Sequence, residues 1–421
     1  MIRPILTPVN GWENIRPHQS KFEHEFFSKM RDDPAVNEGN PSILRVEDSS
    51  RKPRRTLKYP GKSRDLILLG DKPLVAETPE SLLDDDTTPT ELLFIRNNGR
   101  IPERTHDPYK WTLRVDGEVE NELSLTLAEL KSKYETLTRR MVIECGGNGR
   151  SFFDPPVRGN RWTHGGVACP QWTGVRLADV LKTARLKPSA VFSGHYGSDP
   201  AIADTSKPAL SRGVPVAKLL DENNLLVWAV NGEPLPLEHG FPLRLIIPGW
   251  PGAVSAKWLT RIWIRDRRHD GPGMTGISYK IPIRPMPPPT GGAKYDQTNL
   301  EDLESMPVRA IITRPADGAR VAAGKVELRG ASWAGDFTVN YVVVSTDRGK
   351  TWQAAELLPP NNSYDWQRWT ASVNTPSTGH MEIWAKATDS RGISQPIEAE
   401  NWNPHGVGGN PVHRIAVTID T

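Results

Sequence analysis

One cysteine of this chain lies in a glycine-rich segment beside several basic residues. Cys145 is followed by Gly146, Gly147 and Gly149, and the segment continues through Arg150, Arg158, Arg161 and Trp162. Because glycine permits positive φ angles and close approach of a ligand, the sulfur is expected on a turn. A nearby guanidinium favours the thiolate, which is the form that ligates soft metals or attacks electrophiles. A buried thiol that ends the apolar strand 141–143 is the alternative, and spacing alone leaves both interpretations open.

Composition places the chain among globular proteins. Its 421 residues, 37% of them hydrophobic, suffice for two domains with a large core. The 53 basic and 50 acidic residues leave a formal charge of +3, which gives no electrostatic case for nucleic-acid binding. Two cysteines, Cys145 and Cys169, exclude a disulfide framework. The longest apolar runs, such as 225–230, are too short to cross a bilayer, so no membrane span is predicted.

The N-terminal residues are polar and irregular. We predict an extended arm over 1–88, with one helix near Phe22–Met30. No apolar stretch follows Met1 or the pair Arg54-Arg55, so no export signal is visible. The chain as given is therefore expected in the cytoplasm, or in the periplasm if an export signal was removed.

The middle of the chain, residues 89–300, alternates short strands with single helices, which indicates an α+β domain. A strand is expected at 110–115, and a helix should begin after Thr126, whose hydroxyl can cap it. A strand at 139–144 should deliver Cys145 to its loop. Further helices are expected at 177–183 and 216–220, and buried strands at 225–230 and 243–247. No Gly-x-Gly-x-x-Gly turn follows a strand, so a nicotinamide-binding fold is not indicated.

The C-terminal part, residues 305–421, has strands at the spacing of an immunoglobulin-like β-sandwich. Residues 341–345 and 352–355, joined by a turn at 347–349, predict a hairpin. The proline- and glycine-rich segment 286–292 predicts a linker before this domain.

Several motifs, in one order along the chain, resemble the sulfite oxidase family of molybdenum enzymes. The Cys-Gly-Gly-Asn-Gly-Arg-Ser segment is joined by Phe-Ile-Arg-Asn-Asn at 94–98, Val-Arg-Gly-Asn-Arg-Trp at 157–162, Trp-Thr-Gly-Val-Arg-Leu-Ala-Asp-Val-Leu at 172–181, Glu-His-Gly-Phe-Pro-Leu-Arg at 238–244, Lys-Trp-Leu at 257–259 and Tyr-Lys at 279–280. The sandwich resembles the family's dimerisation domain through Ser-Thr-Asp-Arg-Gly-Lys-Thr-Trp at 345–352 and Trp-Asn-Pro-His-Gly-Val at 402–407. The resemblance covers about residues 90–421, and several ordered motifs make it more specific than one glycine-rich loop.

The resemblance implies a molybdenum–molybdopterin cofactor, with Cys145 as the protein's metal ligand, and a homodimer formed through the sandwich. Arginine suits the binding of an oxyanion such as sulfite because its planar fork stays charged. The implied catalytic residues are Arg96, Arg150, Tyr279, Trp162, Arg158 and His405. The implied cofactor-binding residues are Asn98, His239, Arg244, Ser255, Ala256 and Lys257.

Two positions depart from the family pattern. Asn98 stands where animal and plant members commonly have histidine, and asparagine carries no charge. His405 stands where the Trp-Asn-x-Arg-Gly-Val motif supplies an arginine to the substrate pocket. Because histidine is only partly charged near neutral pH, we hypothesise that oxyanion binding through His405 weakens as pH rises through its pKa.

The function that the resemblance implies is oxidation of sulfite to sulfate, with electrons passed to an external acceptor such as cytochrome c. Residues 1–88 contain no His-Pro-Gly-Gly segment of the kind found in the haem domain of animal members, so no haem is expected in this chain. Direct use of oxygen is an alternative, and so is a related molybdenum enzyme acting on sulfane sulfur or on another small oxyanion or S-oxide. A non-catalytic assembly module built on the sandwich is the alternative from outside the enzymes.

Overall fold

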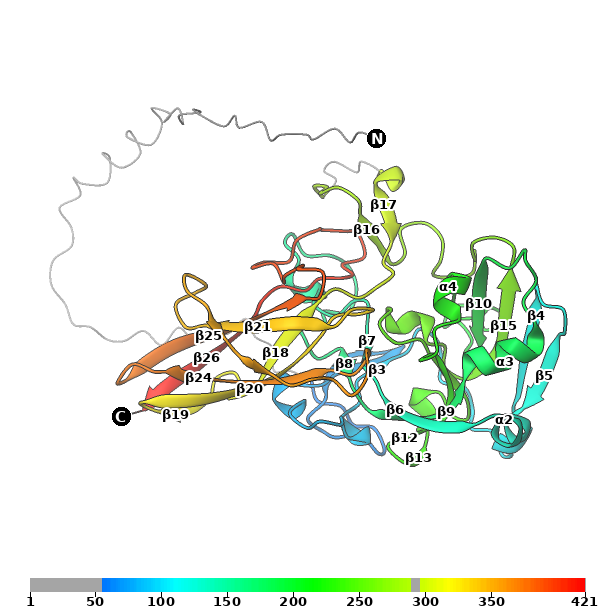
Figure 1. Cartoon of the computed structure of the whole chain (residues 1–421), viewed down its shortest axis with the longest axis horizontal. Helices are drawn as coiled ribbons and strands as arrows, with labels where there is room; N and C mark the ends of the chain where they lie inside the picture. Colours follow the sequence, from blue (N-terminus) through cyan, green and yellow to red (C-terminus); the bar gives the residue numbers. More distant parts are fainter. Residues whose placement is uncertain (1–54, 289–295, 421) are drawn as a thin grey trace, which may run out of the picture. The chain divides into compact units, whose positions relative to one another are not determined.

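The computed structural model describes residues 55–288 and 296–420, whose elements are drawn in Figure 1. The expected helix at Phe22–Met30 and the end of the expected linker 286–292 lie outside the described residues. Within the described ranges, no helix combines the length and the hydropathy that a bilayer crossing requires. Two structural classes follow one another along this part of the chain, first mixed α and β elements and then strands alone.

Residues 55–88 differ from the extended arm that was predicted for them. They form part of a three-stranded sheet with order β1 (Ile67–Asp71), β2 (Leu74–Glu77) and β3 (Ile95–Arg96). Leu57, Leu66 and Ala76 are buried in one apolar cluster with Ile95 of β3. The segment is polar on average, but these few spaced apolar residues are enough to dock it, because each buried side chain contributes about 1.5–3 kcal/mol.

The α+β class predicted for the middle of the chain is confirmed. One sheet has the order β11 (Ser211–Arg212), β10 (Phe192–Gly197), β15 (Leu259–Arg265), β4 (Thr112–Gly117) and β5 (Leu123–Thr126). A second has the order β13 (Glu233–Pro234), β12 (Leu225–Val230), β9 (Gln171–Arg176) and β6 (Thr136–Arg140), and β14 (Arg244–Ile246) also pairs with β12. The helices are α2 (Leu127–Lys133), α3 (Leu177–Ala184) and α4 (Val216–Leu219). Thr126 caps α2 as predicted, in a capping box with Glu129.

The strand predicted at 139–144 is divided into two. Its first part ends β6, which pairs with β9, whereas β7 (Ile143–Glu144) pairs with β8 (Val167–Ala168) in a separate ladder. Between them, the Val142 N–H donates to the Tyr364 carbonyl at 2.8 Å. The chain changes partners at this point, and β7 is the strand that leads directly into Cys145.

The predicted sandwich is also confirmed, and its two layers appear in Figure 1. One sheet has the order β18 (Arg309–Arg314), β20 (Lys325–Trp333), β24 (Gln367–Asn374) and β23 (Glu356–Leu357). The other has the order β19 (Arg320–Ala322), β26 (His413–Asp420), β25 (Gly379–Asp389), β21 (Val339–Ser345) and β22 (Gln353–Ala354). The predicted hairpin is the pairing of β21 with β22. A small ladder of β16 (Lys280–Pro282) and β17 (Leu300–Asp302) precedes the sandwich, and the domain boundaries near 88, 300 and 305 stay predictions.

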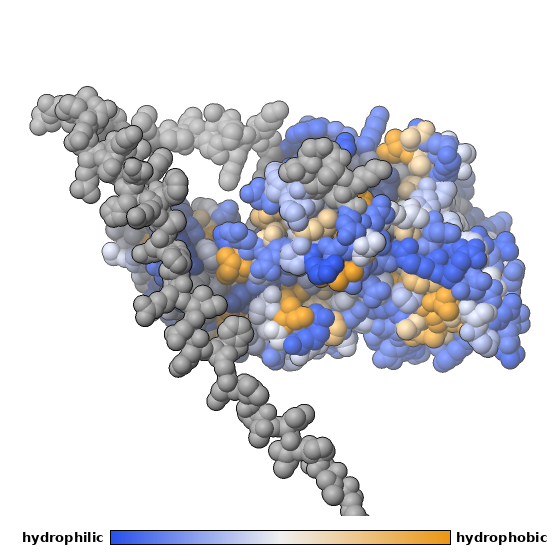
Figure 2. Space-filling view, turned by 90° about the horizontal axis from the view of Figure 1, so that it is seen from above, coloured by the Kyte–Doolittle hydropathy of each residue, from blue (hydrophilic) through white to orange (hydrophobic). Residues whose placement is uncertain are grey.

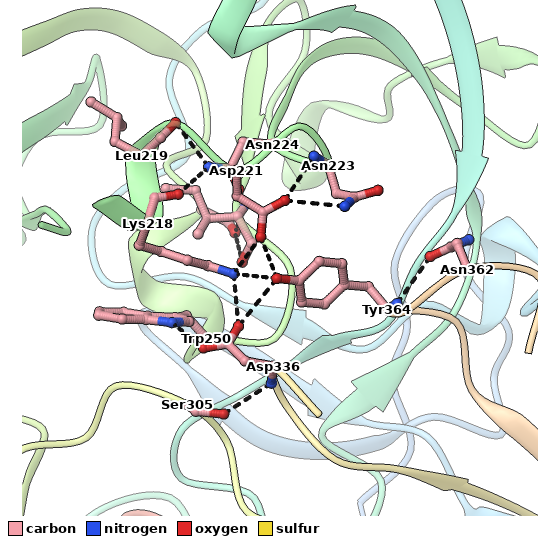
Figure 3. A network of polar contacts seen from close by, with 12 residues as sticks. Lys218, Leu219, Asp221, Asn223, Asn224, Trp250, Ser305, Asp336, Asn362 and Tyr364 are labelled. Atoms are coloured by element: carbon pink, nitrogen blue, oxygen red, sulfur yellow. Dashed lines mark hydrogen bonds and ion pairs between the residues drawn. The ribbon is translucent and has the colours of Figure 1, made fainter. Parts of the chain in front are cut away.

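A polar network joins the mixed sheets to the sandwich (Figure 3). The Lys218 ammonium donates to Asp336 at 2.7 Å and to the Tyr364 hydroxyl at 2.8 Å. The Trp250 indole N–H donates to the other Asp336 oxygen at 2.8 Å, and the Tyr364 hydroxyl donates to Asp221. Trp250 comes directly before the turn at 251–254, so this network fixes one wall of the cleft described below.

Apolar residues on the face shown in Figure 2 form separate small patches within a mainly hydrophilic surface. Exposed large apolar side chains of the described residues include Tyr109, Ile283, Tyr341 and Ile393, which come from different parts of the chain. Scattered exposed apolar residues of this kind are ordinary on protein surfaces.

Candidate active site

Cys145 opens onto a cleft of about 880 Å³ that lies among the mixed sheets. Most of the residues proposed from the sequence share its wall, although they come from distant segments of the chain. These residues are Arg96, Asn98, Cys145, His239, Arg244, Ser255, Ala256, Lys257 and Tyr279. The cleft is therefore the place where the proposed metal ligand and the proposed cofactor contacts can act together.

Backbone hydrogen bonds shape the loop after β7. The Cys145 N–H donates to the Gly166 carbonyl at 2.8 Å, and the Asn148 N–H donates to the Cys145 carbonyl at 2.8 Å. Gly149 then takes φ 82°, and a Cβ there would lie 2.1 Å from the Gly409 carbonyl oxygen. Only glycine fits both the angle and this close approach. The glycine turn predicted after the thiol is thus confirmed, but Cys145 itself is 6% exposed and packs in an apolar cluster, as the alternative of a buried thiol at a strand end predicted.

The residue before the cysteine is a fully buried carboxylate. Glu144 accepts from the guanidinium of Arg309 at 3.0 Å, and Arg309 belongs to β18 of the sandwich. It also accepts from the Trp333 indole at 2.7 Å and from the Asn148 amide at 2.9 Å. The side chains of Arg309 and Glu144 are 0% and 2% exposed. The sandwich therefore positions the cysteine loop through a buried ion pair.

Burial raises the pKa of the Cys145 thiol, while the guanidinium groups of Arg96 and Arg150 act in the opposite direction. Desolvation is the largest cause, so the arginines alone do not produce a thiolate. The Gly147 N–H donates to the sulfur at 3.4 Å, which further favours the charged form. A coordinated metal ion would supply the additional positive charge that deprotonates the thiol.

Two basic side chains, Arg244 and Lys257, lie in the cleft beside His239, and burial together with nearby cations lowers the pKa of His239 well below its ordinary value of 6.5. The Lys257 ammonium donates to the Glu238 carbonyl at 2.8 Å and to the Asn97 side chain. Burial lowers the pKa of Arg244 to about 9, and burial together with the charge of Arg244 lowers the pKa of Lys257 well below its ordinary range. Buried like charges at this density favour an anion between them.

The unpartnered atoms here fit a phosphate-bearing cofactor. Arg244 Nε and Asn97 Nδ2 are buried donors without a hydrogen-bond partner, and within residues 55–288 and 296–420 neither Arg244 nor Lys257 forms a carboxylate ion pair. The same ranges hold no group of three or more His, Cys, Asp or Glu side chains arranged to bind a metal. The resemblance to the molybdenum enzymes implies that a metal at Cys145 would take its further ligands from the bound cofactor.

A second group of residues surrounds Tyr279. A Cβ at Gly146 would lie 3.1 Å from the Tyr279 ring, so this ring packs against the cysteine loop. The guanidinium of Arg212 lies 4.2 Å from the centre of the same ring. Arg150 Nε donates to the His405 carbonyl at 2.8 Å, which brings the loop after β25 to this group.

Four of the proposed catalytic residues do not line the cleft. Arg150 and His405 lie beside it, and their roles remain proposals. Trp162 is fully buried behind the wall, with its ring packed edge-on against Phe94 at 5.8 Å, so it supports the pocket's shape indirectly. Arg158 is exposed, and the structure does not bring it to the cleft.

Other residues of the cleft were missed by the sequence analysis. Arg212, His195 and Asp199 line it, and Lys62 lies 3.0 Å from His239 Nε2. Burial raises the pKa of Asp199 to about 6, while Lys257 opposes that rise. Each of these residues is a single polar side chain without a surrounding motif, so no local signal could have identified it.

Comparison with known protein families defines the class. Residues 98–272 match the model of the oxidoreductase molybdopterin-binding domain, and residues 301–420 match that of the Mo-co oxidoreductase dimerisation domain. The fold therefore combines the molybdopterin-binding domain of such oxidoreductases with their dimerisation domain at the C-terminal end. Both domain types agree with the fold class predicted from the sequence.

Curated relatives define the family. The sulfite oxidase of Gallus gallus is 32% identical over 375 residues, which cover 85% of this chain and 78% of that protein. The mitochondrial sulfite oxidase of Drosophila melanogaster is 33% identical over 367 residues, and the chain spans 62% of its length. The sulfane dehydrogenase SoxCD from Paracoccus pantotrophus has the same fold, with a TM-score of 0.68 at 23% identity over 90% of this chain and 92% of that one. This chain belongs to the sulfite oxidase family.

Proposed function

We propose that this chain oxidises sulfite to sulfate at a molybdenum–molybdopterin cofactor held by Cys145, and passes the electrons to a separate acceptor such as cytochrome c. The observation that carries this proposal is the thiol of Cys145 at a cleft where, within the described residues, Arg244 and Lys257 form no carboxylate ion pair. When bound, the cofactor supplies the two-electron redox chemistry. The Gallus gallus and Drosophila melanogaster relatives are sulfite oxidases.

The chain's own residues would divide the work between binding cofactor and binding substrate. His239, Arg244 and Lys257 would hold the anionic part of the cofactor, with Asn98 and the turn at 255–256 as further contacts. Arg96 and Arg150 would hold the oxyanion, because fixed guanidinium groups offset its loss of water in a partly buried cleft. The Tyr279 hydroxyl would donate a hydrogen bond to an oxygen of the bound oxyanion.

Metal content and a spectral change test this function directly. Protein produced with molybdenum should contain stoichiometric molybdenum, and its visible absorbance should bleach when sulfite is added under anaerobic conditions. Sulfate is the control, because it is already oxidised and should cause no bleaching. Loaded protein that keeps its spectrum in sulfite would contradict the proposal, and protein that never takes up molybdenum would favour a non-catalytic assembly role.

The acceptor can be identified by comparing turnover with ferricyanide, cytochrome c and oxygen. We expect cytochrome c to support turnover and oxygen to support little. Thiosulfate replaces sulfite in a parallel series, because the fold is shared with a sulfane dehydrogenase. Faster turnover with thiosulfate than with sulfite would move the substrate class to sulfane sulfur.

We further propose that the sandwich forms a homodimer, in line with its match to a dimerisation domain. Sedimentation equilibrium should give twice the chain mass of 46.8 kDa at micromolar concentration. A species at the single-chain mass under these conditions would argue against the dimer.

His405 provides a prediction about pH. Burial and the nearby charges of Arg150 and Arg212 lower its pKa below the ordinary value of 6.5. A lowered pKa means that His405 is charged only at acidic pH and is already neutral at pH 7. The KM for sulfite of the wild type should therefore rise as pH climbs toward 6.5, and His405 should contribute no further rise between pH 7 and 9.

The matched variant is His405→Arg, which keeps the charge at every pH in this range. Its KM should stay low where the KM of the wild type rises. Protonation of sulfite changes both KM values equally, so its effect cancels in their ratio. His405→Gln should give the high KM at all pH values. Superimposable KM profiles for the wild type and His405→Arg from pH 5 to 9 would reject a role for the histidine charge.

A further inference from the structure

Arg212 is a buried cation of the cleft that no motif indicated. It lies on β11, is 3% exposed, and takes part in the wall of the same cleft as Cys145 and Tyr279. One terminal nitrogen, Nη1, donates to the Gly273 carbonyl. Its Nε is buried and has no hydrogen-bond partner within residues 55–288 and 296–420. The side edge of this guanidinium is thus free to act as a donor pair.

Three of the four other buried arginines of the described residues are paired with carboxylates, whereas Arg244, a cofactor contact in the proposed function, is not. Arg309 pairs with Glu144, Arg265 pairs with Asp270, and Arg368 pairs with Asp84. Arg212 has no carboxylate within ion-pair distance in the described part of the chain. A buried charge without a counter-ion costs several kcal/mol unless an anion offsets it, so this position fits a charged ligand rather than a structural role.

The surroundings of Arg212 place that ligand near the cysteine loop. Its guanidinium lies 4.2 Å from the centre of the Tyr279 ring, and this ring packs against Gly146, the residue after Cys145. Tyr279 has φ 54°, a left-handed angle that non-glycine residues adopt at a cost of roughly 1–2 kcal/mol, so the ring is held there by its surroundings. Arg150 and His405 belong to the same neighbourhood, because Arg150 donates to the His405 carbonyl and the charges of Arg150 and Arg212, after burial, lower the pKa of His405.

We propose that Arg212 is a substrate-binding residue whose free Nε–Nη2 edge donates two parallel hydrogen bonds to the doubly charged oxyanion. This inference rests on the proposed function, since sulfite and sulfate are the oxyanions concerned. Arg150 donates through Nε to the His405 carbonyl and through Nη1 to the Asn160 carbonyl. Arg96 donates through Nη1 to the Asn97 carbonyl. Within the described residues, Arg150 therefore keeps only part of its Nε–Nη2 edge, whereas Arg96 keeps this edge and Arg212 adds a second one.

The test compares Arg212→Gln and Arg212→Lys with the control Arg265→Gln in cofactor-loaded enzyme. Arg265 is also a buried arginine, 2% exposed, but it is paired and does not line the cleft. Calorimetry with sulfate should show binding weakened about 10–100-fold in Arg212→Gln, the usual effect of losing a charged hydrogen-bond donor. The KM for sulfite should rise by a similar factor, with a much smaller change in kcat. Arg212→Lys should lose less, because lysine keeps the charge but not the fork.

Several results would overturn the role of Arg212. The first is a sulfate affinity in Arg212→Gln that equals that of the wild type. The second is an equal loss of affinity in Arg265→Gln, because it would indicate a general structural effect. A fall in kcat with unchanged sulfate affinity would mean that Arg212 only supports Tyr279. Should Arg212→Gln fail to load cofactor, Arg212→Lys carries the test, and undiminished sulfate affinity in it would also count against the proposal. A wild type that binds sulfate but does not oxidise sulfite would remove the proposed function while leaving Arg212 as an anion-binding residue.

Discussion

Cys145→Ser should abolish the bleaching of the cofactor spectrum by sulfite and lower turnover by more than about 100-fold. Loss of a residue that only supports a metal ligand usually lowers activity by about 10–100-fold, and loss of the ligand itself should have a larger effect. The physical reason is the change from sulfur to oxygen. A serine oxygen is a harder ligand that donates less charge to a soft metal, and an alcohol is far less acidic than a thiol. Turnover and molybdenum content should be measured on the same preparations, so that loss of metal and loss of activity are separated.

Cys169→Ser is the matched control for this substitution. Cys169 is also buried, but its thiol donates to Asp365 at 3.3 Å and does not line the cleft. Its replacement should leave the sulfite-dependent bleaching intact, because a serine hydroxyl can donate the same hydrogen bond. Bleaching that survives in Cys145→Ser, or disappears equally in Cys169→Ser, would remove Cys145 from the proposed role as metal ligand.

Arg309→Met should cost about 3–5 kcal/mol of unfolding free energy, the range found when one partner of a buried ion pair is removed. The variant leaves the Glu144 carboxylate buried with only the neutral donors Trp333 and Asn148. It also removes the Arg309 donor to the Asn148 carbonyl, which lies 3.3 Å away in the cysteine loop. Cofactor content should therefore fall together with stability. Denaturant unfolding of the purified protein measures the first, and metal analysis measures the second.

Two variants make this prediction specific. Arg320→Met removes an exposed arginine that pairs with Asp420 on the sandwich surface, and it should cost no more than about 1 kcal/mol. Glu144→Gln combined with Arg309→Met removes both buried charges, so it should be less destabilised than Arg309→Met alone. Equal losses in Arg309→Met and Arg320→Met would show that burial of the pair does not matter.

Much of the fold was predictable because local patterns and tertiary packing agree. The turn at 347–349 between two strand segments predicted the hairpin of β21 and β22, and Thr126 predicted the start of α2 through its capping chemistry. The prediction failed for residues 55–88, whose average polarity concealed the few apolar residues that dock them. It also merged β6 and β7, since periodicity cannot reveal that two adjacent strands pair with different partners.

The candidate site was predictable only where residues stand in motifs. Arg96, Cys145, Arg244 and Lys257 were identified by their neighbours in sequence, and the structure brings them to one cleft. Arg158 stands in an equally basic segment, yet it is exposed, because the loop after Cys145 turns its side chain to solvent. Arg212 stands outside every motif and still reaches the cleft.

The sequence by itself determined the chemistry that is available: a thiol among glycines that permit its turn, arginines suited to oxyanions, and two successive domain types. Only the tertiary structure decided which charges act together. Glu144 and Arg309 are far apart in the chain and become one buried pair, whereas Arg212 has no counter-ion among the residues that the structure describes. The reason is that pairing and desolvation of a charge depend on neighbours brought together by folding, and no local sequence pattern records those neighbours.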